Sequence, residues 1–315
     1  MKKLLLFLLL LFPLTAFADL EVHFLDVGHG DCAIIMCDGE TAILDGGNSG
    51  CSQLIYAYLQ QHEISHLKYA IASHPDADHI GGLPAAMHAA QVDCLYSPVL
   101  EHDTVRFSKL IETATEKGVP VKTLKKGDAL QLGGSVLTFL NPSEGSSSDA
   151  NDMSFVIRLD YGKTSFLFCA DASSKVEKRL MDDGSDLNVD VIKVAHHGSG
   201  ESTLLQFALS TSPKYAVISG NEKYNNPDDE VILKLLASNA HILHTLQNGH
   251  IIIRSDGKKL VAEAEDYYIG NTNTDKFHRK NCDSVSSMSK KNKTTIFTRE
   301  EAVFRHYDPC KRCAP

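Results

Sequence analysis

Four side chains that can bind metal ions lie within one segment of six residues, 74–79, which reads His-Pro-Asp-Ala-Asp-His. A short apolar stretch precedes this segment, and an isoleucine and two glycines follow it. His74 and Asp76 are two residues apart, so an extended loop can direct both side chains toward one ion. The adjacent Asp78 and His79 would point differently from that pair, toward a second ion. A solvated acidic loop is the alternative, but two histidines that flank two aspartates favour a metal site.

Three other segments carry polar side chains at the end of a predicted strand, next to glycine or another small residue. Asp45 precedes a pair of glycines, Asp171 lies between two alanines, and His196 and His197 precede Gly-Ser. Each alone is consistent with a turn cap or a packed side chain. Because α/β folds build their sites at strand ends, the three segments and the histidine-aspartate segment together predict one site.

The predicted strands fall into two blocks, and helices are interleaved with the strands of each block. The predicted strands are 21–27, 33–36, 41–44, 67–72, 119–124, 135–140, 154–160, 164–169, 189–195, 215–219, 251–254 and 259–264, and the predicted helices are 54–61, 83–90, 107–117, 173–181 and 231–236. A polar, serine-rich loop is expected over 143–152. Two blocks of this kind predict an α/β sandwich, in which two sheets face each other and helices cover the outside.

The N-terminus has the three parts of a secretory signal peptide. Lys2 and Lys3 precede an apolar run over 4–14, and Ala-Phe-Ala follows at 16–18. The alternative is a membrane anchor, but the run is shorter than the roughly 20 apolar residues that span a bilayer. We therefore expect cleavage before Asp19 and export to the periplasm or the extracellular space, with no stable membrane insertion of the mature chain.

The C-terminal segment contains the side chains of a second metal site. Cys310 and Cys313 form a Cys-x-x-Cys pair, and three residues separate His278 from Cys282. One histidine and three cysteines predict a closed structural zinc site. A disulfide from Cys282 to Cys310 or Cys313 is the alternative, which an oxidising compartment would permit.

Charge divides the chain into an acidic body and a basic tail. The net charge is −9, whereas the last fifty residues carry ten Lys/Arg and six Asp/Glu, a net +4. The acidic balance disfavours a protein that binds duplex DNA by bulk electrostatics. A solvated surface is the ordinary interpretation of the tail's charge, and a grip on a nucleic-acid backbone is the functional one. The candidate contacts are Lys276, Arg279, Lys280, Lys290, Lys291, Lys293, Lys311 and Arg312.

The motifs of the body resemble the metallo-β-lactamase superfamily, in particular the extracellular hydrolase domain of the DNA-uptake protein ComEC and its free-standing secreted relatives. The resemblance covers roughly residues 19–265 and adds the segment Asp-Val-Gly-His-Gly-Asp at 26–31 to the motifs above. It implies an αββα fold with two divalent ions. It also implies that Asp171 bridges the ions and that Asp45 orients the cluster. The implied ligands are His74, Asp76, Asp78, His79, Asp171 and His196 or His197.

The chain departs from the superfamily pattern in ways that affect the choice of metal. Asp76 replaces the usual middle histidine, and the separate third histidine of the first ion is missing, with Asn151 and Ser154 near its place. Ala170 replaces a glycine, and Asn-Asn-Pro at 225–227 replaces the Gly-His-Pro of ComEC-like sequences. Oxygen ligands shift the preference from zinc toward manganese or magnesium, so we expect either manganese or zinc in this site.

The tail resembles the small zinc module of the Ada alkylation-repair protein. The first ligand of that module is a cysteine that accepts methyl groups, and here it is His278, so methyl transfer is not expected. The predicted organisation is a signal peptide (1–18), a metallo-β-lactamase-like hydrolase domain (19–265) and an Ada-like zinc-binding module (266–315).

The resemblance implies a secreted metal-dependent hydrolase, with Asp78, His79 and Asp45 in the catalytic machinery and a metal-bound hydroxide as nucleophile. Carboxylate-rich ligands favour a phosphodiesterase or nuclease that acts on DNA or nucleotides. A β-lactam substrate is disfavoured, because enzymes of that kind use more imidazole at the first ion. The alternatives are a hydrolase of a small phosphoester or lactone, and a non-catalytic nucleic-acid-binding protein.

Overall fold

The computed structural model describes residues 20–142, 149–220, 226–265, 268–280, 282–296, 302, 305–313 and 315. The predicted signal peptide and residues 143–148 of the predicted polar loop lie outside these ranges, as does Asn225. Within them, no helix combines the length and the apolar character that crossing a bilayer requires.

The first large sheet contains both the earliest and the latest strands of the body. Its inner strands β1 and β16 pair antiparallel, whereas β3, β5, β7 and β8 run parallel. Its spatial order is β17 (Leu260–Glu265), β16 (His250–Ser255), β1 (Leu20–Phe24), β2 (Ala33–Cys37), β3 (Glu40–Leu44), β5 (Tyr69–Ile71), β7 (Leu95–Tyr96) and β8 (Val121–Lys122).

The second large sheet is formed by the middle of the chain. Its first strands form an antiparallel meander, and the strands from β12 onward run parallel. Its spatial order is β15 (His241–His244), β14 (Tyr215–Ile218), β13 (Val191–Lys193), β12 (Thr164–Phe168), β11 (Val156–Tyr161), β10 (Ser135–Asn141) and β9 (Ala129–Leu132).

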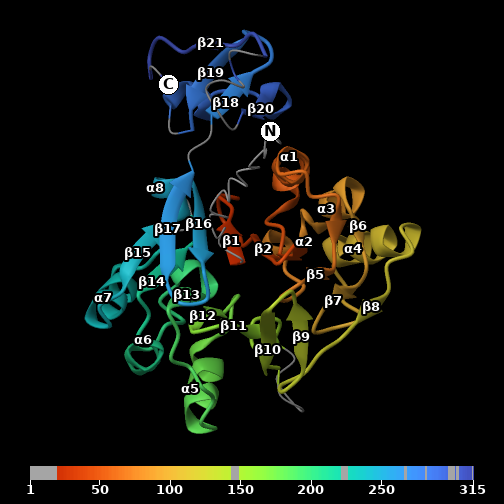
Figure 1. Ribbon diagram of the computed structural model, residues 1–315. Helices are drawn as coiled ribbons and strands as arrows, with labels where there is room; N and C mark the ends of the chain where they lie inside the picture. Colours follow the sequence, from red (N-terminus) through yellow and green to blue (C-terminus); the bar gives the residue numbers. More distant parts are fainter. Residues whose placement is uncertain are drawn as a thin grey trace, which may run out of the picture.

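The two sheets pack face to face, and helices cover their outer faces (Figure 1). Phe24 of the first sheet meets Phe168 of the second, with ring centroids 5.9 Å apart. The burial of β10 alternates residue by residue, as expected for a strand with one face in this core. The outer helices are α1 (Ser52–Gln61), α3 (Leu83–Ala89) and α4 (Val105–Glu116) on the first sheet, and α5 (Ser174–Asp182), α6 (Leu205–Thr211) and α7 (Asp229–Ala237) on the second. The predicted αββα sandwich is confirmed.

The segment 119–124 is the clearest difference from the predicted elements, since only Val121–Lys122 forms a strand there. Pro120 explains the short strand, because it has no N–H to donate, although its carbonyl accepts a hydrogen bond from Leu95. The remaining short elements are β4 (His66–Leu67), β6 (Gln91–Val92), α2 (Ala77–Ile80), α8 (Thr245–Asn248), α9 (Asp283–Ser286), and 3₁₀ turns at Ser49–Cys51, Ala195–Gly198 and Lys290–Asn292.

The tail forms its own four-stranded sheet at one end of the sandwich, beyond α1 and α8 in Figure 1. Lys280 anchors it to the body, because its Nζ lies 3.3 Å from Asp26 Oδ2 and donates to the carbonyl of Thr245 at 3.1 Å. The order of the tail sheet is β20 (Lys293–Ile296), β18 (Tyr268–Asn271), β19 (Lys276–Arg279) and β21 (Asp308–Pro309).

Candidate metal centre

The candidate ligands of the body lie where strands of both large sheets end, at one edge of the sandwich. Asp45 follows β3, and His74 lies in the segment that follows β5. Asp171 follows β12, and His197 follows β13 in the second sheet. Because all four strands end toward the same edge, side chains that are far apart in the sequence meet there.

One group of side chains gathers around Asp171 and is buried. His74, His79 and Asp171 each offer a ligand atom within 4.8 Å of the other two. His79 therefore groups with His74, whereas the sequence predicted that it would share a second ion with Asp78. His79 Nε2 lies 3.1 Å from Asp171 Oδ1, and His74 Nε2 lies 3.9 Å from Asp171 Oδ2. Asp76 lies at the rim of this group, with its Oδ2 3.7 Å from His74 Nε2 and a half-exposed side chain.

A second group contains Asp78, His197 and His29. His197 Nε2 lies 3.4 Å from Asp78 Oδ2 and 3.6 Å from Asp171 Oδ1. His196 Nε2 lies 3.7 Å from Asp171 Oδ2. Asp171 therefore faces both groups, as expected of a carboxylate that bridges two ions.

Several residues of the centre adopt left-handed backbone conformations that side chains other than glycine rarely adopt. The φ angles are 60° at Asp45, 46° at Ala170, 49° at His196 and 55° at His197. Each costs about 1–2 kcal/mol relative to a right-handed conformation. Ala170, which replaces a glycine of the superfamily pattern, carries this strain directly before the bridging carboxylate. Strain that clusters in this way is typical of functional sites held in place by their surroundings.

Asp45 orients His79 from behind. Asp45 Oδ1 accepts a hydrogen bond from the backbone N–H of Ser73 at 2.7 Å, and its Oδ2 lies 2.8 Å from His79 Nδ1. Burial disfavours a charged imidazole, but the carboxylates of Asp171 and Asp45 outweigh burial and raise the pKa of His79 well above its usual range. With Nδ1 held by Asp45, Nε2 of His79 is directed toward Asp171, which is the role predicted for Asp45.

A buried ion pair supports His197 in a similar way. Lys193 Nζ lies 2.8 Å from Asp31 Oδ1, which also accepts a hydrogen bond from Ser219 Oγ at 2.6 Å. His197 Nδ1 lies 3.0 Å from the carbonyl oxygen of Ser219 and 3.3 Å from Asp31 Oδ1. Although burial opposes a charged imidazole, Asp171 and Asp31 raise the pKa of His197 to about 9. The sequence analysis assigned no role to Asp31, Lys193 or Ser219.

The residues of the centre fit a pair of divalent ions. His74 Nε2, His79 Nε2, His197 Nε2 and Asp171 Oδ1 are buried, and none makes a hydrogen bond within the described part of the chain. Buried polar atoms normally have such partners, so these four atoms, which come from both groups, indicate that the centre binds cations. The carboxylates that raise the histidine pKa values would also attract a divalent cation to the centre.

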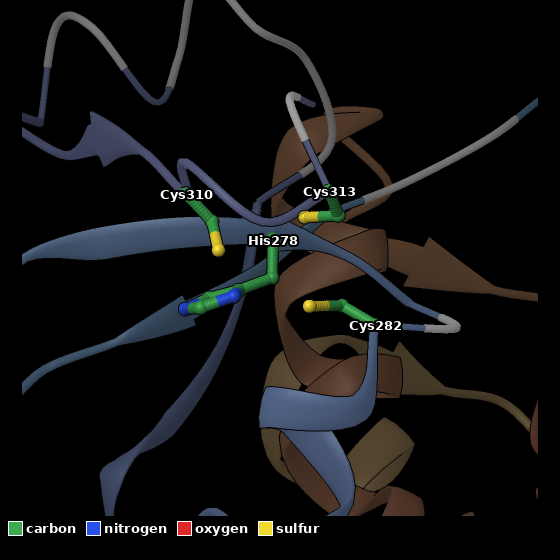
Figure 2. A group of neighbouring side chains, drawn as sticks. All are labelled: His278, Cys282, Cys310 and Cys313. Carbon is green, nitrogen blue, oxygen red and sulfur yellow. The ribbon is translucent and has the colours of Figure 1, made fainter.

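The four predicted ligands of the tail also lie together. His278, Cys282, Cys310 and Cys313 each offer a ligand atom within 4.8 Å of the others, and Figure 2 shows the three sulfur atoms around a common space beside the imidazole. Backbone amides of Arg279 and Arg312 donate to the sulfur atoms of Cys313 and Cys310, each at 3.4 Å. This arrangement suits a tetrahedral ion with sulfur and nitrogen ligands.

The predicted basic contacts of the tail divide into two kinds. Lys280 is largely buried against the body, where it pairs with Asp26, so it anchors the tail and is not placed for the phosphate contact that we expected of it. Lys293 is half-buried in β20. The others are exposed: Lys276, Arg279, Lys290, Lys291, Lys311 and Arg312.

Residues 25–220 match the family described as the metallo-beta-lactamase superfamily. The chain belongs to this superfamily. It is 28% identical over 268 residues to "ComE operon protein 3" of Bacillus subtilis, a match that covers 79% of this chain and 34% of that protein. It is 28% identical over 255 residues to "Recombination protein 2" of Haemophilus influenzae, which covers 79% of this chain and 30% of the relative. These relatives confirm the predicted ComEC-like resemblance.

The chain spans about a third of the length of these curated relatives. Among solved structures, it resembles the metallo-beta-lactamase fold protein YhfI from Bacillus subtilis, with a TM-score of 0.50 and 14% sequence identity. That likeness covers 72% of this chain and 96% of YhfI, and it supports the fold of the body. The side chains that gather at the strand ends are therefore the candidate metal ligands of this superfamily domain.

Replacing Asp45 with Asn should weaken metal binding without unfolding the chain. The amide keeps the size of the carboxylate but loses the charge that orients His79, and such supporting residues typically change metal affinity by about 10–100-fold. Competition with a chromogenic chelator would measure the change. Asp93→Asn is a matched control, because Asp93 pairs with His66 at 2.8 Å on the surface, away from the centre. Equal affinities in both variants would contradict the role of Asp45.

Proposed function

We propose that this chain is an exported, metal-dependent phosphodiesterase that acts on DNA or nucleotides. The observation that best supports this proposal is that a carboxylate-rich centre and a basic tail lie at the same edge of the sandwich. Lys280 of the tail pairs with Asp26, which follows β1 and begins the loop that leads to His29 and Asp31 at the centre. The tail is therefore anchored to the loop that carries His29 and Asp31.

The ligand chemistry supports a phosphodiester as the substrate. Two ions, when bound, would supply the Lewis acidity that activates water and offsets the charge of the phosphate. His74, Asp76, His79 and Asp171 would hold one ion, and Asp78, His197 and Asp171 the other. Hard carboxylate oxygens favour ions such as manganese, which bind phosphate oxygens well.

The supporting residues fix the geometry of the ligands. Asp45 holds Nδ1 of His79, and the carbonyl of Ser219 with Asp31 holds Nδ1 of His197. Each imidazole then presents Nε2 to the centre in one orientation. Lys193 of the second sheet offsets the charge of Asp31. The carboxylate of Asp31 can therefore be buried beside His197.

The tail supplies the recognition part of the proposal. We propose that it holds one structural zinc through His278, Cys282, Cys310 and Cys313. Its exposed lysines and arginines would bind the phosphate backbone of a nucleic acid and lead it to the acidic centre. One relative is named a recombination protein, which supports DNA as the substrate class.

The decisive experiment incubates the purified full-length chain with end-labelled single-stranded DNA and manganese. We expect shortening of the DNA, which EDTA should abolish. Cleavage of small phosphodiesters or lactones, but of no DNA, would favour the alternative of a small-substrate hydrolase. DNA binding without cleavage of any substrate would favour a non-catalytic binding protein.

Export is tested by fractionation of the producing cells, with N-terminal sequencing to look for a mature chain that begins near Asp19.

Manganese should support hydrolysis at least as well as zinc does. The expected reason is that Asp76, Asp78 and Asp171 make the centre rich in hard oxygen ligands. Protein stripped of metal would be given one equivalent of zinc for the tail and then titrated with manganese or with more zinc. Initial rates on a chromogenic phosphodiester measure the outcome. Restoration of turnover by additional zinc alone would contradict a preference of the centre for hard metal ions.

A further inference from the structure

His29 lies in the loop between β1 and β2, which packs directly against the residues that follow His74. Gly30 makes this close contact possible, because a Cβ at that position would lie 2.2 Å from the backbone oxygen of Asp78. The backbone N–H of Asp31 also donates to that oxygen at 3.3 Å. The loop is thus fixed to the backbone of Asp78, and the position of His29 relative to the centre is set by main-chain contacts.

The imidazole of His29 faces the second group of ligands. Its Nε2 lies 3.5 Å from Asp78 Oδ2, and its ring centroid lies 4.3 Å from that of His197. The three side chains each offer a ligand atom within 4.8 Å of the other two, as His74, His79 and Asp171 also do. The side chain of His29 is 20% exposed, so it lines the accessible side of the centre.

We propose that His29 is a ligand of the second divalent ion, together with Asp78 and His197. The sequence lacks one histidine of the superfamily pattern at the first ion, and His29 adds an imidazole at the second ion, beside that of His197. Each ion would then have two imidazoles and one carboxylate of its own, and Asp171 would lie between them. This inference rests on the proposed binding of two ions and does not depend on the substrate.

The test compares the metal affinity of His29→Ala with that of the wild-type chain. Cobalt would be titrated after the tail has been filled with zinc, and the visible spectrum would report the number and the environment of the cobalt ions. We expect the wild type to bind two cobalt ions and His29→Ala to lose affinity for one of them, by at least about tenfold. His102→Ala is the matched control, because His102 is also half-buried but contacts Thr104 and Phe107 instead.

A second measurement keeps the inference testable if His29→Ala folds poorly. In wild-type protein that is labelled with ¹⁵N-histidine and loaded with ¹¹³Cd, His29 should show a nitrogen–cadmium coupling and His102 should not. An uncoupled His29 in protein that holds two cadmium ions would overturn the proposal, as would an unchanged cobalt titration of His29→Ala. If His29→Ala lost one ion and the wild-type chain cleaved no DNA, the result would support His29 as a metal ligand and refute the proposed nuclease activity.

Discussion

Asp78→Ala should lower hydrolysis of a phosphodiester by about a thousandfold or more while leaving the fold intact. The carboxylate faces His197 and His29 in the centre, whereas the backbone oxygen of Asp78, which the substitution preserves, accepts the hydrogen bond from Asp31. Since the side chain is 29% exposed, its removal leaves no large cavity. Steady-state rates with saturating manganese, beside the melting temperature of each protein, measure both expectations.

His79→Ala should abolish turnover to a similar extent, but with a loss of stability. Its imidazole is fully buried, and its removal leaves the buried carboxylate of Asp45 without this partner. An unsatisfied buried group of this kind costs about 1–3 kcal/mol. Asp93→Ala serves as the surface control for both variants. If Asp78→Ala and His79→Ala retained wild-type turnover, the assignment of the centre as the active site would be refuted.

Neutralising the exposed charges of the tail should weaken action on long DNA and leave small substrates unaffected. We expect this of a full-length chain in which Lys290, Lys291, Lys311 and Arg312 are each replaced by Gln. Each lost phosphate contact lowers the slope of log affinity against log salt by about 0.7 for single strands. The four substitutions should therefore reduce that slope by up to about 3. Filter binding over a range of salt concentrations, with parallel rates on a chromogenic phosphodiester, measures both effects.

The matched control carries the same change of charge on the body. Lys117, Lys163, Lys178 and Lys258 are exposed there, and replacing them with Gln should leave the salt slope nearly unchanged. Equal salt slopes for the tail variant, the body variant and the wild type would show that the tail does not bind the DNA backbone. Deletion of residues 266–315 is less specific, because it also removes Lys280 from Asp26 beside the centre.

The sequence predicts those parts of the site that depend on neighbouring residues. The spacing of the histidine-aspartate segment and the polar side chains at strand ends identified His74, Asp171 and His197, since the strand signals place them at one edge. The α/β sandwich, with two sheets inside and helices outside, followed from the same strand and helix patterns, and the family resemblance implied the αββα fold. These features need only local information and one rule about where α/β folds build sites.

The missed features depend on contacts between distant parts of the chain. Lys193 belongs to an apolar strand, and nothing near it in the sequence shows that it pairs with Asp31 or that Asp31 also accepts a hydrogen bond from Ser219. His29 was visible in its motif, but its role depends on Asp78 and on His197. Lys280 was counted as an exposed charge, because a count of charges does not show which lysine is docked against the body.

The position of β1 has a consequence for how the chain is made. Its residues, Leu20–Phe24, pair with β2 on one side and with β16, His250–Ser255, on the other. Until residues 250–255 pair with it, β1 therefore has one open edge. An apolar strand with an open edge readily pairs with other chains. A message truncated before codon 251 would therefore yield a product prone to aggregation, and chaperones that cover this edge would raise the yield of the intact protein.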